Sequence, residues 1–125
     1  MEIKVEDFFV LISIFEKYYK SNFPIEEAIS MCNLKSQLDI AYLQIQEEYK
    51  NILNQYNISN LENINDSIKE LSEEQQKLLQ KDLDDFSKKL FDIQIDTISL
   101  KIKNLKGFII SPLDIEILSP IINFI

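Results

Sequence analysis

The stretch LDIAYLQIQEEYKNILNQY, Leu38 to Tyr56, decides the expected fold of this chain. Its large apolar side chains recur in alternating steps of four and three residues: Leu38, Tyr42, Ile45, Tyr49, Ile52 and Tyr56. That spacing places all six on one stripe of an α-helix, with aliphatic residues and tyrosines each repeating every seven positions. The pattern therefore predicts a long helix with an apolar seam that packs against another helix.

The helix is expected to cover residues 24–57. Pro24 suits the first helical turn, where its missing N–H costs nothing, and Glu26 and Glu27 complement the positive end of the helix. No further proline or glycine interrupts the chain before Asn57.

A second seam helix is expected over residues 72–91. Ser72 and Gln75 form a capping box at its start. Apolar residues then follow in steps of four, three and four: Leu79, Leu83, Phe86 and Leu90. The polar residues 58–71 would connect the two helices, with a helical turn within them, so the helices should form an antiparallel hairpin.

The remaining segments complete one domain of residues 1–125. Residues 6–20 are apolar on nearly every side, which predicts a helix in the centre of the core. A short strand at 3–5 and short extended pieces after Phe91 are also expected, because Ile93 and Ile95 alternate with polar residues. Ser111 and Pro112 begin a terminal helical segment, which Ser119-Pro120 breaks or restarts. The expected fold class is mainly α, with residues 92–125 forming the extended element and a terminal helical turn.

The composition excludes several functions. The chain of 125 residues has a net charge of −8 and contains no Arg, His or Trp. Without imidazole or guanidinium groups, the usual catalytic pairs and zinc sites are missing, and we expect neither an enzyme nor a cofactor. The negative charge disfavours direct binding to nucleic acid or to an anionic membrane. The acidic Met1–Asp7 segment is no targeting signal, and no apolar run spans a bilayer, so a cytoplasmic location is expected.

Two groups of side chains and one cysteine are candidate functional sites. The acidic residues of the second helix most simply form a solvated face, and otherwise a surface that mimics nucleic acid: Glu73, Glu74, Asp82, Asp84 and Asp85. Their spacing does not match a calcium loop, so no metal is expected. The tyrosines most simply belong to the hairpin core, and otherwise to an interface with a second copy. Cys32 is expected to be a small buried residue, since Lys35 alone could activate it.

The terminal segment SPLDIEILSPIINFI has two interpretations. In the first, its apolar residues cover the open end of the hairpin. In the second, they form an amphipathic anchor that inserts into a groove on another subunit or a host protein. The residues concerned are Leu113, Ile117, Leu118, Ile121, Ile122 and Phe124.

The order of segments resembles a loose group of small, mostly helical proteins of bacteriophages and prophages from low-GC bacteria. The resemblance rests on a short apolar first helix, a long helix ending in EEYKNILNQY, a segment like DLDDFSKKLFDIQID, and the closing ISPLDIEILSPII. It implies a non-enzymatic phage accessory or virion-assembly protein that acts by protein–protein contact, as a homo-oligomer or with a host or phage protein. The location would then be the bacterial cytoplasm or the virion. The alternative is an acidic inhibitor of a host defence system, such as an anti-CRISPR protein, that occupies a basic site.

Overall fold

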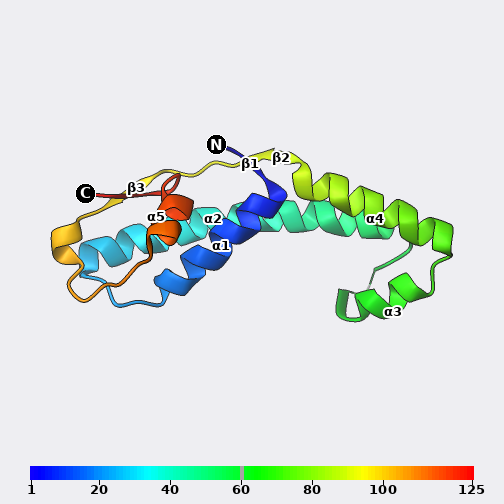
Figure 1. The fold of residues 1–125 in the computed structure, drawn as a ribbon, viewed down its shortest axis with the longest axis horizontal. Coiled ribbons are helices and arrows are strands. Elements are labelled where there is room, and N and C mark those ends of the chain that lie inside the picture. Colours follow the sequence, from blue (N-terminus) through cyan, green and yellow to red (C-terminus); the bar gives the residue numbers. More distant parts are fainter. Residues whose placement is uncertain (60) are drawn as a thin grey trace.

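The chain folds into an elongated, mainly helical molecule in the computed structural model, which describes residues 1–59 and 61–125 (Figure 1). Its helices are α1 (Val5–Tyr19), α2 (Ile25–Asn54), α3 (Ile64–Lys69), α4 (Glu73–Lys88) and α5 (Pro112–Leu118). Its strands are β1 (Glu2–Lys4), β2 (Leu90–Asp92), β3 (Ile98–Leu100) and β4 (Ile122–Phe124), and single 3₁₀ turns cover η1 (Leu61–Asn63) and η2 (Ile102–Asn104). The predicted fold class is confirmed. Among the described residues, no helix combines the length and apolar character that crossing a bilayer requires.

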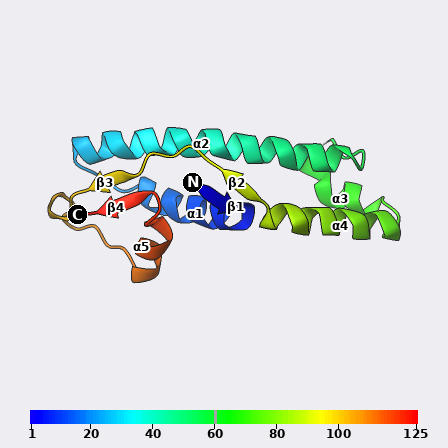
Figure 2. The same cartoon turned by 90° about the horizontal axis from the view of Figure 1, so that it is seen from above.

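The predicted hairpin is present, because α4 runs antiparallel to the C-terminal half of α2 (Figures 1 and 2). The prediction that the second helix reaches residue 91 is wrong, because α4 ends at Lys88 and Leu90 is exposed in β2, which pairs with β1. The turn that follows α2 contains a left-handed residue, Asn57, with a φ of 59°. The Ile58 N–H donates to the Leu53 carbonyl at 3.0 Å and the Asn57 N–H donates to the Asn54 carbonyl at 3.0 Å. This pair of bonds is a Schellman motif, in which asparagine takes the place of the usual glycine.

The tip of the hairpin has a small core of its own, formed by the buried side chains of Leu53, Ile58 and Leu79. Short elements η1 and α3 fold back against it, so the predicted helical turn within the 58–71 connection is confirmed. Residue 60 of that connection lies outside the described residues. At the start of α4, the Gln75 N–H donates to Ser72 Oγ at 3.2 Å, as the capping box predicts.

The main core lies between α1 and residues 31–45 of α2. Every third or fourth residue of both helices is buried there: Phe8, Leu11, Phe15, Tyr18, Met31, Leu34, Leu38, Ala41 and Ile45. The prediction that α1 lies in the centre of the core is confirmed, although Phe9 and Val10 are exposed. Ala41, and not Tyr42, completes the buried stripe of α2, which follows steps of three and four residues from Met31 to Ile45.

The extended segment after α4 runs back along α2 and joins two separate two-stranded sheets (Figure 2). β2 pairs antiparallel with β1, with Phe91 opposite Ile3. β3 pairs parallel with β4, with Ser99 opposite Asn123. Between them, the Asp96 N–H donates to Gln37 Oε1 at 2.7 Å, which holds this part of the segment against α2.

The terminal segment differs from its prediction in two respects. Ser119 and Pro120 do end α5, but residues 122–124 form β4 instead of a further helical turn. In addition, α5 packs against α1 and does not cover the open end of the hairpin. The physical reason is that β3 leaves an unpaired backbone edge beside the core, and β4 satisfies it.

Candidate functional site

The six apolar residues of the terminal segment are divided between core and surface. Leu118, Ile121 and Ile122 are buried in the main core, so the prediction that they form a partner-binding anchor is corrected. Ile117 and Phe124 are half-buried against the same core. Leu113 is exposed and remains free to contact a partner. The segment is therefore mainly part of the structure of the domain.

Asp114 holds the terminal segment to α1. Its buried carboxylate accepts hydrogen bonds from the Tyr18 hydroxyl and, at 3.2 Å, from Lys17 Nζ. Its backbone N–H donates to Ser111 Oγ at 3.2 Å, as the helix-start pattern predicts. The bond from Tyr18 and the positive charge of Lys17 lower the pKa of the Asp114 carboxyl, although burial opposes them. Because every contact is internal, this cluster stabilises the fold.

The five acidic residues of α4 do not form a single face. Asp82 turns toward α2 and accepts a hydrogen bond from the Tyr56 hydroxyl, which raises the pKa of Tyr56. The other four side chains are exposed: Glu73, Glu74, Asp84 and Asp85. In the part of the chain that the structure describes, no group of three or more His, Cys, Asp or Glu residues could hold a metal ion.

The tyrosines occupy three different environments. Tyr56 is bonded to Asp82, and Tyr49 meets Phe86 of α4 edge-on with ring centroids 6.2 Å apart. Tyr42 is partly exposed and meets Phe9 of α1 edge-on, at 6.1 Å. The interpretation of the row as hairpin core therefore applies to Tyr49 and Tyr56. Cys32 was expected to be buried and is instead exposed on α2, with its sulfur 3.8 Å from the Tyr19 hydroxyl oxygen.

A row of exposed aliphatic side chains follows the outer face of α2, opposite its buried stripe. Ile25, Ile29, Ile40 and Leu43 are 77%, 57%, 59% and 62% exposed. At 100° per residue they fall within a sector of about 60°, and Cys32 and Ser36 fall between them on the same face. We call these four aliphatic residues the outer row. Sequence reasoning missed it, because every apolar residue of a helix is a candidate for the core until the tertiary contacts are known.

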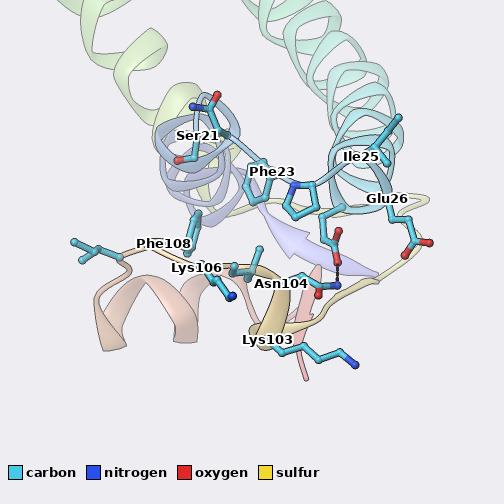
Figure 3. A pocket seen from close by; sticks show the side chains of 14 residues that line it. Ser21, Phe23, Ile25, Glu26, Lys103, Asn104, Lys106 and Phe108 are labelled. Carbon is cyan, nitrogen blue, oxygen red and sulfur yellow. Dashed lines mark hydrogen bonds between the residues drawn. The ribbon is translucent and has the colours of Figure 1, made fainter.

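A pocket of about 960 Å³ lies at the end of the molecule where α2 begins (Figure 3). One wall is the 21–27 segment leading into α2, and the other is the 103–109 loop. We call this the end pocket. The loop turns at Gly107, whose φ of +77° is in the left-handed region that favours glycine.

A buried carboxylate lies between the two walls of the end pocket. Asn104 Nδ2 donates a hydrogen bond of 2.8 Å to Glu27 Oε1, drawn as a dashed line in Figure 3. Phe23 and Phe108 approach each other across the pocket with ring centroids 5.6 Å apart. Lys103 and Lys106 carry the positive charge of the loop wall. Sequence reasoning placed Glu27 at the helix start but missed Asn104, which is distant in the chain.

Comparison with known proteins identifies no relative: no protein-family model, no curated protein and no solved structure matches the chain. The function is therefore inferred from the outer row and the end pocket.

Proposed function

We propose that this chain is a non-enzymatic accessory or virion-assembly protein of a bacteriophage that acts by contact with another protein through the outer row. The observation that carries the proposal is the exposure of four large aliphatic side chains along one face of the longest helix. Exposed apolar side chains that gather on one face are typical of interaction sites.

The geometry of the outer row suits an apolar groove or a helix on the partner. The small side chains of Cys32 and Ser36 separate Ile29 from Ile40, so a partner helix can approach the α2 backbone closely in the middle of the row. Ile25 and Leu43 at its ends are eighteen residues apart, about 27 Å along the helix. This is the arrangement by which an amphipathic helix binds a groove.

The phage setting is supported by the resemblance in the order of segments, from the apolar first helix to ISPLDIEILSPII. A non-enzymatic role is supported by the composition, since the chain has no His or Arg. A structural or adaptor role requires only a stable scaffold and a contact surface.

The experiment compares two variants that each add one positive charge to an exposed position of α2. Leu43→Lys disrupts the outer row, whereas Gln44→Lys lies one residue outside it. Mass spectrometry of purified particles of the encoding phage should find the wild type and Gln44→Lys in stoichiometric amounts and Leu43→Lys strongly reduced. Absence of the wild-type chain from particles would contradict the assembly role, and equal incorporation of both variants would contradict the role of the outer row.

A second candidate is the acidic inhibitor of a host defence protein. The observation in its favour is that Glu73, Glu74, Asp84 and Asp85 remain exposed on α4 of a protein with a net charge of −8. Exposed charges are screened over about 10 Å at 0.1 M salt, so this complex should weaken strongly as salt rises. Contact through the outer row should be nearly insensitive to salt. Titration of the captured partner at two salt concentrations separates the two functions.

A further inference from the structure

The end pocket contains a buried acceptor that lacks a donor. Glu27 is only 4% exposed, and its Oε1 accepts the bond from Asn104. Its Oε2 is buried without a hydrogen-bond partner among the described residues. Removing a carboxylate oxygen from water without replacing its hydrogen bonds costs free energy, so such atoms are rare and indicate a missing donor.

The local sequence explains why the second oxygen is free. Glu27 is the third residue of α2, the position from which a glutamate side chain usually reaches back to the backbone N–H of the residue before the helix. Here that residue is Pro24, which has no N–H. The carboxylate is therefore available to the 103–109 loop and to the end pocket. Glu27 lines the end pocket, and contact of a ligand with its buried Oε2 requires a rotation about the last side-chain bond, which is a soft torsion.

The rest of the pocket shows what kind of group could supply the donor. Phe23 and Phe108 provide aromatic faces, which attract cations as well as alkyl groups. Lys103 and Lys106 are exposed on the opposite wall, and neither has an ion pair within the described part of the chain. The two walls carry equal and opposite charge. Glu26 and Glu27 lie on one wall, and the two lysines lie on the other. A bare cation would meet the lysines and a bare anion would meet the glutamates.

We infer that the end pocket binds a zwitterionic ligand with a basic side chain, whose ammonium or guanidinium group donates to Glu27 Oε2, and with an anionic group that lies against Lys103 and Lys106. The alkyl part of the ligand packs against the outer surface of the Phe23–Phe108 ring pair. A volume of about 960 Å³ is within the range of small-molecule sites and admits an amino acid or a dipeptide unit. The ligand is either a free basic amino acid or a basic residue beside an acidic one in a protein segment. The inference does not depend on the outer row.

The first test uses L-arginine, with citrulline as a probe whose side chain has nearly the same shape but no charge, and follows the Asn104 side-chain amide resonance. Arginine should bind at least about tenfold more tightly than citrulline, because only the guanidinium pairs a positive charge with the Glu27 carboxylate. Glu27→Gln should weaken arginine binding about 10- to 100-fold. The control Glu47→Gln, an exposed position of α2 with the same charge change, should bind as the wild type does. Equal binding by wild type and Glu27→Gln, or no binding of arginine or of the dipeptide below, would overturn the inference.

The second test uses Lys103→Ala/Lys106→Ala, a double variant at exposed positions. It should weaken binding of arginine several-fold but not that of butylguanidinium, which has no anionic group. An unchanged affinity of the double variant for arginine would show that the anionic group of the ligand does not lie against Lys103 and Lys106, and would overturn that part of the inference. Because the two lysines are exposed, the double variant should fold, and this test can be made even if Glu27→Gln fails to fold.

The last test distinguishes a free amino acid from a protein segment as the source of the ligand. Acetyl-Arg-Asp-amide should exceed arginine in affinity if the natural ligand is a protein segment, and the reverse order indicates a free amino acid. Either order supports the zwitterionic class. Leu43→Lys should bind the preferred probe as the wild type does, so that failure of the pocket and failure of the outer row are distinguishable.

Discussion

Asp114 shows how one residue can join segments that are distant in the chain. It is the third residue of α5, and its carboxylate is bonded to Tyr18 and Lys17 of α1. The Tyr18 hydrogen bond and the Lys17 charge favour the ionised carboxylate, and they exist only in the folded state. Protonation of Asp114 therefore opposes folding.

The pKa of Asp114 predicts a specific pH dependence of stability. Because the pKa is lower in the folded state than the ordinary value of 3.8, the folded state binds fewer protons in this range. The stabilisation is complete above the unfolded pKa and is lost as the pH falls through the folded pKa. Urea unfolding between pH 7 and pH 3 should show a smaller loss of stability for Asp114→Asn than for the wild type.

The control for this experiment is Glu116→Gln, which removes an exposed carboxylate from the same helix. It should keep the pH dependence of the wild type. If Asp114→Asn also kept it, the bonds to Tyr18 and Lys17 would not determine the acid sensitivity.

At the scale of elements, periodicity predicted the helices well because a helix is defined by contacts within one stretch of chain. The seam of Leu38, Ile45 and Ile52 and the capping box at Ser72 are local signals. In the structure Leu38 and Ile45 are buried, Ile52 is half-buried, and Ser72 accepts the capping hydrogen bond. The pairing of β3 with β4 had no such signal. It joins Ser99 to Asn123 in parallel, and nothing near either residue specifies the other.

The same limit applies to the sites. Pro24 followed by Glu27 was visible in the sequence, but the meeting of Glu27 with Asn104 depends on how the 103–109 loop returns to α2. Likewise, Ile25 and Ile29 could not be assigned to the surface before the position of α1 was known.

The terminal segment gives a prediction about stability. Ile121 is fully buried, whereas Ile125 is 58% exposed. Ile121→Ala should lower the free energy of unfolding by about 2–5 kcal/mol, since it leaves a cavity in the main core. Ile125→Ala should change it by less than about 0.5 kcal/mol, as is usual for surface positions. Equal effects in chemical denaturation would mean that the segment is not part of the core.

At the scale of the whole molecule, two clusters of buried residues follow one another along the hairpin. The main core joins α1, α2, α5 and the strands, whereas the tip is held by Leu53, Ile58 and Leu79 with half-buried neighbours. Few buried contacts mean a lower free energy of local opening.

We therefore predict that backbone amides at the tip, such as that of Leu79, exchange with solvent faster than that of Ile45 in native-state hydrogen exchange. Leu79→Ala should accelerate exchange in α3 and at the tip while leaving the protection of Ile45 largely unchanged. Uniform acceleration along the chain would show that both clusters open as one unit.

The length of α2 also determines how the molecule diffuses. Its 30 residues span about 45 Å. A compact domain of this chain length has a radius of gyration of only about 14 Å, so this one helix is about three times as long as that radius. Friction with water depends on this elongation, so a monomer should leave a gel-filtration column ahead of a spherical standard of 14.7 kDa. A light-scattering detector at the column outlet measures mass independently of shape. It therefore separates an elongated monomer from a dimer joined through the outer row.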